Sequence, residues 1–120
     1  RGIPASRVIL AGFSQGGAVT LAAGLRRRVP LAGLIGLSTY LPAPRTADAA
    51  LAEGASRQPV FMAHGRQDPV VPLAAGEQSA GWLRNAGFDV DWHVYPMPHS
   101  VCAEEIVAIG DWFERRFAAG

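Results

Sequence analysis

Apolar residues recur along this chain with two different periods, and Gly or Pro stands at nearly every change between them. Runs of strand length occupy residues 7–11, 33–38, 59–64 and 88–95. The middle two runs are apolar without alternation, which is typical of parallel strands covered on both faces. These segments are therefore predicted to be neighbouring strands of one parallel sheet.

Longer segments of helical period lie at residues 15–28, 46–53, 73–85 and 103–117. In the last segment, apolar residues recur at helical spacing at Ile106, Ile109, Phe113 and Phe117. Such a stripe is typical of a helix packed on a sheet, so it is predicted to face the sheet. The alternation of elements predicts an α/β fold, a single domain over residues 1–120 with about four parallel strands and helices on both faces.

The amino-acid composition excludes several classes of function. Hydrophobic residues make up 49% of the chain and charged residues 18%, the balance of a packed globule. The basic residues number 11 against 10 acidic ones, and all are arginine, which excludes a Schiff-base lysine and a phosphate-loop lysine. Residues 26–28 are consecutive arginines without interleaved aromatic residues, so no nucleic-acid partner is predicted.

The cellular setting is also constrained by the sequence. No apolar run approaches the roughly 18 residues that a transmembrane helix needs, so no membrane-spanning segment is predicted. Cys102 is the only cysteine, which excludes an internal disulfide and a cysteine zinc cluster. A reducing compartment, the cytoplasm, is therefore predicted.

The segment GFSQGG at residues 12–17 follows the first predicted strand and opens the first predicted helix. A tight strand-to-helix turn presents a serine, here Ser14, to a base and a substrate, and Gly12 and Gly16 leave room for the two elements to approach. The backbone N–H of Gln15 can donate to an oxyanion at the helix start. The alternative is a glycine-rich turn in which Ser14 merely caps the helix.

A carboxylate and a histidine follow Ser14, each in a loop after a later strand. Parallel strands end at one edge of a sheet, and Asp68 and His99 both come four residues past a predicted strand end. The remaining carboxylates lie on helices or at the opposite edge. His93 lies inside a strand and is predicted to pack there, whereas His64 closes a strand at the correct edge and is predicted to be structural.

These positions predict Ser14 as nucleophile, His99 as general base and Asp68 as the group that orients the base. A metal site built from His64, Asp68 and His99 is the alternative, but it lacks a tight ligand pair such as H-E-x-x-H. No metal and no cofactor are predicted.

Motifs across residues 7–117 resemble the phospholipase/carboxylesterase family of α/β-hydrolases, which includes acyl-protein thioesterases: GFSQGGAVTL at 12–21, GLSTYLP at 36–42, HGRQDPVVP at 64–72 and YPMPHSVCAEEI at 95–106. The resemblance implies the C-terminal half of an α/β-hydrolase fold. It implies a serine carboxylesterase that cleaves short- to medium-chain esters or thioesters without a cofactor. It further implies substrate-binding roles for Tyr40, Leu41, Val70 and Met97.

The sequence departs from the family in two ways. Pro98 stands where relatives usually place a glycine before the histidine, which restricts Met97 and stiffens the loop. No loop before Arg1 supplies the second oxyanion donor, and members of the family are longer than this chain. Two hypotheses follow: a weakened esterase, or a catalytically dead half-domain that serves as an interaction module. A peptidase or dienelactone-type hydrolase on the same turn is a further alternative.

The same departure predicts an open sheet edge. In the full fold the strand at residues 7–11 is central, so in a half-domain its outer N–H and C=O groups lack a neighbouring strand. We therefore expect association through this edge, with a second copy as a homodimer or with a separate N-terminal half.

Overall fold

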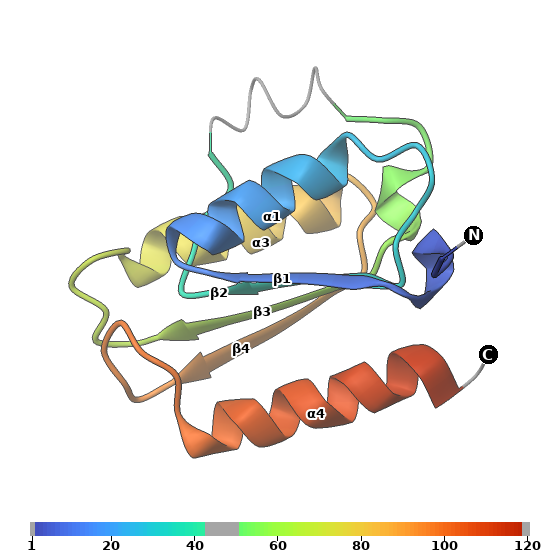
Figure 1. Cartoon of the computed structure of the whole chain (residues 1–120). Helices are drawn as coiled ribbons and strands as arrows, with labels where there is room; N and C mark the ends of the chain where they lie inside the picture. The colour runs from blue at the N-terminus through green and yellow to red at the C-terminus, as the bar shows by residue number, and fades with distance from the viewer. Residues whose placement is uncertain (1, 43–50, 119–120) are drawn as a thin grey trace.

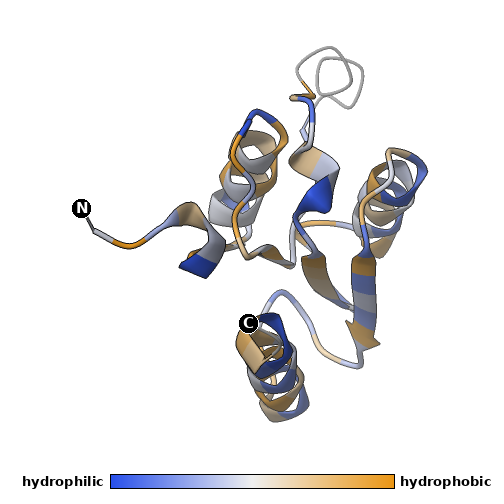
Figure 2. Ribbon diagram, turned by 90° about the vertical axis from the view of Figure 1, so that its right-hand side faces the viewer, coloured by the Kyte–Doolittle hydropathy of each residue, from blue (hydrophilic) through white to orange (hydrophobic). Residues whose placement is uncertain are grey.

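A parallel sheet of four strands organises the computed structural model, which describes residues 2–42 and 51–118. The strands are β1 (Ile9–Phe13), β2 (Gly33–Leu37), β3 (Val60–Gly65) and β4 (Val90–Tyr95), and they neighbour one another in chain order. Helices α1 (Gln15–Leu25) and α3 (Leu73–Asn85) cover one face, and α4 (Ala103–Ala118) covers the other (Figures 1 and 2). Two 3-10 turns, Ala5–Arg7 and Ala55–Arg57, precede β1 and β3. The predicted α/β fold with helices on both faces is confirmed.

The first strand, the first helix and the segment at 46–53 depart from the predicted element boundaries. The predicted strand at residues 7–11 is displaced, because Arg7 ends a 3-10 turn and pairing continues until Phe13 lies opposite Leu37. The predicted helix at 15–28 ends at Leu25, and the N–H groups of Arg26 and Arg27 close its last turn on Ala23 and Gly24. The start of β1 is decided by its pairing register with β2, and local sequence propensity carries no information on that register.

The predicted helix at residues 46–53 lies mostly outside the described residues. Its last part, Leu51 to Glu53, is described and is not helical. The next residue, Gly54, has φ +84°, a left-handed conformation that a right-handed helix cannot continue through.

Two apolar clusters hold the layers together. The larger lies between the sheet and helices α1 and α3 and includes the completely or almost completely buried Leu21, Leu34 and Met62. The smaller lies under α4 and consists of Ile35, Phe61, Ala63 and Trp112, with Trp112 only 2% exposed. Gly33 admits the Trp112 ring, because a Cβ there would lie 2.5 Å from it.

The prediction that the apolar stripe of α4 faces the sheet is wrong in part. Ile109 packs on the smaller cluster, but Ile106 and Phe113 are 60% and 44% exposed. The face of α4 that meets the sheet centres instead on Trp112 and Glu105, both almost completely buried. The helix carries apolar residues on more than one side, so periodicity alone does not identify the packed side.

Strand β1 forms one edge of the sheet, and the described residues place no strand beyond it. The carbonyl of Val8 and the N–H of Ser14 both bond toward β2, at Ala32 and Leu37. Alternation along a strand then directs the N–H groups of residues 9, 11 and 13 outward. Ala11 and Phe13 are exposed on this strand.

Candidate active site

Ser14 occupies the turn between β1 and α1 in an unusual backbone conformation. Its φ of 57° and ψ of −121° are strained for any residue with a Cβ. The N–H of Ser14 donates to the Leu37 carbonyl at 2.9 Å, and the Thr39 hydroxyl donates to the Ser14 carbonyl at 2.6 Å. Its side chain makes no capping hydrogen bond to α1, so the alternative of a simple helix cap is wrong.

The glycines around Ser14 have different tasks. A Cβ on Gly12 would overlap the Gly16 carbonyl, so Gly12 is required for the close approach of β1 and α1. A Cβ on Gly17 would lie 2.7 Å from the Thr39 side chain. Nothing lies within 4 Å of a Cβ on Gly16, so the expectation that Gly16 creates room is wrong within the described chain.

The structure brings Ser14, His99 and Asp68 together from three separate loops at the carboxyl edge of the sheet. His99 Nε2 lies 2.9 Å from Ser14 Oγ, and His99 Nδ1 lies 2.7 Å from Asp68 Oδ2. An ionised carboxylate only accepts, so Nδ1 carries the proton and Nε2 is free to accept from the hydroxyl. This tautomer places a base against the serine.

The other oxygen of Asp68 is bound to its own loop. Oδ1 accepts the N–H groups of Val70 and Val71, each at 2.8 Å. Burial raises the pKa of the Asp68 carboxyl, but hydrogen bonds from His99, Val71 and Val70 outweigh it, and the pKa lies below the ordinary value of 3.8. Asp68 is therefore a carboxylate at neutral pH.

The loop that carries His99 is tied to the loop that carries Asp68. The N–H of Gln67 donates to the Met97 carbonyl at 3.1 Å. A Cβ on Gly65 would overlap the carbonyls of Met97 and Pro98, so the glycine permits this contact. The Phe13 ring lies 4.8 Å from the His99 ring, centroid to centroid, and supports the imidazole from the β1 side.

The remaining histidines differ in their surroundings. His64 is completely buried at the end of β3, with Nε2 2.8 Å from the Val71 carbonyl and 3.5 Å from Asp68 Oδ2. His93 stacks on Phe61 with ring centroids 4.9 Å apart, away from Ser14. Position in the sequence alone did not reveal that His64 touches the Asp68 loop.

The residues with expected substrate-binding roles separate into two groups. Leu41 and Met97 are buried at 3% and 6% exposure, whereas Tyr40 and Val70 are 38% and 63% exposed. Gln15 is the first residue of α1, so its N–H has no partner within the helix.

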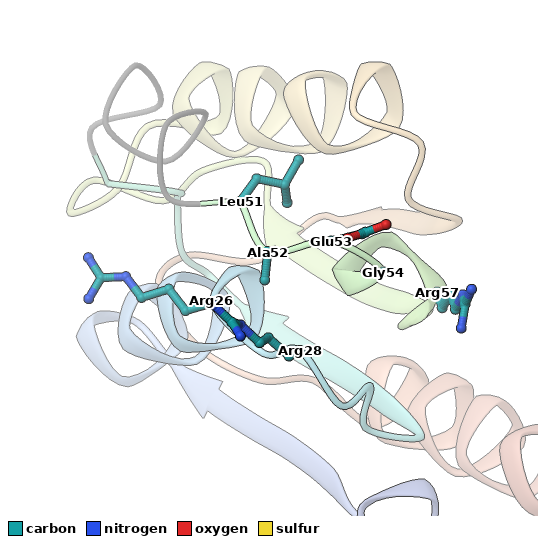
Figure 3. A pocket seen from close by; sticks show the side chains of 7 residues that line it. All are labelled: Arg26, Arg28, Leu51, Ala52, Glu53, Gly54 and Arg57. Atoms are coloured by element: carbon teal, nitrogen blue, oxygen red, sulfur yellow. The ribbon is translucent and has the colours of Figure 1, made fainter.

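A cavity of about 790 Å³ lies away from these residues. It is lined by Arg26, Arg28, Leu51, Ala52, Glu53, Gly54 and Arg57 (Figure 3). Figure 3 shows the side chains of Arg26 and Arg57 pointing away from each other. The guanidinium groups of these two arginines therefore do not converge on a common ligand.

The described residues also bear on metal binding and membrane insertion. Residues 2–42 and 51–118 contain no group of three histidine, cysteine or acidic side chains that could hold a metal ion. In the same part of the chain, no helix is long and apolar enough to cross a membrane.

The chain was compared with known families, proteins and structures. Residues 1–115 match a family model described as phospholipase/carboxylesterase. Acyl-protein thioesterase 1 of Gibberella zeae is 47% identical over 108 residues, which are 88% of this chain and 46% of that protein. The Mycosarcoma maydis protein of the same name is 43% identical, over 94% of this chain and 49% of that protein. The chain thus spans about half the length of these curated relatives.

Solved structures show the same relation. Arabidopsis thaliana SOBER1 has a TM-score of 0.90 and 33% identity, covering 96% of this chain and 55% of that one. Esterase PE8 also has a TM-score of 0.90, with 29% identity over 97% of this chain and 53% of that one. The fold described above is therefore about half of the one that these structures contain.

Proposed function

The chain belongs to the phospholipase/carboxylesterase family, and we propose that it cleaves short- to medium-chain carboxylic esters or thioesters with Ser14 as nucleophile. The observation that carries this proposal is the continuous hydrogen-bond chain from Ser14 Oγ through His99 to Asp68 Oδ2. The names of the relatives, thioesterases and an esterase, support the same class of bond.

In the proposed reaction, His99 Nε2 takes the proton from Ser14 as Oγ attacks the acyl carbonyl. The imidazolium that forms is stabilised by Asp68, 2.7 Å from Nδ1. His99 then returns the proton to the leaving alcohol or thiol, which leaves an acyl group on Ser14. A water molecule, activated by the same imidazole, hydrolyses this acyl-enzyme.

Negative charge develops on the carbonyl oxygen during both steps. The N–H of Gln15 stands at the start of α1, where helix N–H groups and the helix dipole favour an anion. Loss of one oxyanion donor elsewhere costs on the order of 100- to 1,000-fold in turnover. If the chain acts with this donor alone, we expect weak activity.

A fluorophosphonate probe tests the nucleophile, because it reacts with a serine only when a base activates it. We expect the purified chain to gain one probe adduct at Ser14 by peptide mass spectrometry. Ser14→Ala should abolish labelling, whereas Ser6→Ala, at an exposed and distant serine, should label like the parent. No adduct on a chain that circular dichroism shows to be folded contradicts the proposal and favours the dead half-domain.

The substrate class is tested with a panel of nitrophenyl esters, acyl thioesters and peptides. The proposal expects cleavage of esters or thioesters with short to medium acyl chains and no peptide cleavage. Peptide cleavage would instead support the peptidase alternative.

We further propose that the β1 side of the chain associates with a second copy or with a separate N-terminal half. The support is the open edge of β1 and a cavity of about 590 Å³ on helix α1, lined by Gln15, Val19, Ala22 and neighbouring residues. Val19 is 67% exposed there, as expected of a surface that another segment covers. An open strand edge pairs readily with another strand.

Sedimentation velocity combined with amide hydrogen exchange tests this association. We expect a mass above that of one chain and slow exchange at residues 9, 11 and 13. A monomer with fast exchange at these residues contradicts the homodimer, and the separate half is then sought by adding the N-terminal half of a relative.

The compartment is part of the proposal as well. Cys102 is the single cysteine of the sequence, so this chain holds no internal disulfide of the kind that an oxidising compartment favours. We propose the cytoplasm, and fractionation of the source cells checks it.

A further inference from the structure

We propose that His64 is a positioning residue, which holds the Asp68 loop through the Val71 carbonyl and so keeps Asp68 directed at His99. The proposal rests on the proposed function, because it gives His64 a role in supporting the hydrogen-bond chain of Ser14, His99 and Asp68. His64 itself contacts neither Ser14 nor any space that a substrate could reach, since its side chain is 0% exposed.

The contacts of the imidazole define one tautomer. Nε2 lies 2.8 Å from the Val71 carbonyl oxygen, which only accepts, so Nε2 carries the proton. The same N–H lies 3.5 Å from Asp68 Oδ2, the oxygen that also accepts from His99. Its partial positive charge thus adds to the electrostatic environment of the carboxylate in a buried, weakly screened place.

The other ring nitrogen, Nδ1, faces helix α3 and strand β4. Nδ1 is buried without a partner in the described structure. A Cβ on Gly76 of α3 would lie 2.6 Å from Nδ1, and the Trp92 ring of β4 lies 6.2 Å away, centroid to centroid. Neither neighbour is titratable, so Asp68 is the charged group that this imidazole meets. The imidazole therefore acts through its Nε2–H, whose task is to hold the Val71 carbonyl.

That task is visible in the turn that follows Asp68. The Val71 N–H donates to Asp68 Oδ1 at 2.8 Å, while the Val71 carbonyl accepts from His64. The N–H and the carbonyl of Val71 therefore connect the Asp68 carboxylate to His64 at the end of β3. Without the His64 donor, the Val71 carbonyl is unpaired and the end of the turn is held less firmly, although Asp68 and Gln67 keep their backbone hydrogen bonds to Gly65 and Met97. We therefore expect the Asp68 carboxylate to be directed less precisely at His99.

Three substitutions separate hydrogen bonding from packing. His64→Gln retains an N–H near the position of Nε2, because its amide is at the end of the longer side chain. His64→Asn places its amide near Nδ1 and cannot reach Val71, and His64→Phe fills the space without a donor. His93→Phe, on β4 and away from Asp68, is the matched control for the loss of an imidazole.

Two measurements are made on each folded variant of the full chain. One is the rate of Ser14 labelling at saturating fluorophosphonate, which is independent of probe affinity. The other is the low-field proton resonance of the His99 Nδ1–H···Asp68 hydrogen bond, which does not require catalysis. A displaced catalytic group can cost up to about 100-fold in rate.

We expect His64→Phe and His64→Asn to label about 10- to 100-fold more slowly and to lose the low-field resonance. His64→Gln and His93→Phe should keep both near parental values. The proposal is overturned if His64→Phe melts at a lower temperature but keeps the labelling rate and the resonance, or if His64→Gln is as impaired as His64→Phe. If the parent chain is not labelled at all, the proposed function fails, and the resonance alone then decides the role of His64.

Discussion

At the scale of single residues, Asp68 receives hydrogen bonds from His99, Val70 and Val71, and all of them favour the ionised carboxylate. The bonds from Val70 and Val71 stabilise the turn that begins at Asp68, and the bond from His99 joins this turn to the loop after β4. The same contacts that orient His99 therefore also stabilise the fold, and this contribution depends on pH.

Asp68→Asn should remove a stability contribution that exists only when the carboxylate is charged. The pKa of Asp68 in the folded chain lies below 3.8, so its contribution is fully present above that value and is lost as pH falls through the folded pKa. Urea unfolding from pH 7 to pH 2 should show a constant difference between parent and variant above about pH 5, which shrinks in more acidic solution. A difference that grows toward acid would contradict this assignment.

Ser14 combines chemistry with backbone strain. A residue held at φ 57° and ψ −121° is destabilised by about 1–3 kcal/mol, which glycine avoids. Ser14→Gly should therefore abolish probe labelling and raise the free energy of unfolding, whereas Ser14→Ala abolishes labelling and keeps the strain. Thermal unfolding of both variants decides this, and equal stabilities would show that the turn is not strained.

At the scale of elements, α4 attaches to the sheet through a small contact region. Trp112 is 2% exposed, whereas its sequence neighbour Phe113 is 44% exposed. Removal of a buried aromatic side chain costs about 3–5 kcal/mol. Trp112→Ala should show a loss of this size in urea unfolding, and Phe113→Ala, the matched control, a much smaller one. Comparable losses would mean that the apolar stripe is packed after all.

Glu105 is an unusual residue for the packed side of α4. It is completely buried, and its Oε1 accepts the Cys102 N–H at 3.3 Å, as in a capping box. Its Oε2 has no partner in the described structure. Burial raises the pKa of Glu105 above its ordinary 4.5, although the Cys102 hydrogen bond and His93 lower it in part.

A raised carboxyl pKa means that the folded chain binds this proton more tightly than the unfolded chain does. Stability should therefore rise as pH falls from above the folded pKa toward 4.5. Glu105→Gln, which carries no charge, should lack this rise and be more stable than the parent at neutral pH. Urea unfolding of both chains between pH 8 and pH 5 is the measurement, and parallel curves would contradict the prediction.

At the scale of the whole molecule, β1 is both the strand that ends at Ser14 and the open edge of the sheet. Association at this edge and support of the active-site turn are therefore linked. Ala11 is exposed and its N–H points outward, so a change there acts on the edge rather than on β2.

Ala11→Pro should weaken association, because proline removes one outward donor and is tolerated at sheet edges. Ala11→Val keeps the N–H and is the matched control. Sedimentation velocity over a range of concentrations should show a smaller mass for the proline variant and an unchanged mass for valine. If both variants associate like the parent, contact through the β1 edge is wrong.

Much of this molecule follows from local patterns in the sequence. Continuous apolar runs predicted the two central strands, β2 and β3, and α3 has the predicted bounds of Leu73–Asn85. Position relative to the carboxyl edge of the sheet separated Asp68 from the other acidic residues and His99 from His93, since parallel strands end on the same side. It did not exclude His64, which lies at the same edge.

Other features depend on contacts between distant residues, and only the tertiary structure decided them. The start of β1 depends on its register with β2, the packed side of α4 depends on where Trp112 meets Gly33, and the contact of His64 with Val71 depends on the path of a turn. The sequence by itself determined the fold class and the residues chosen as candidates, because periodicity and turn chemistry are local. The hydrogen-bond distances among Ser14, His99 and Asp68 join three loops, so only folding brings them about.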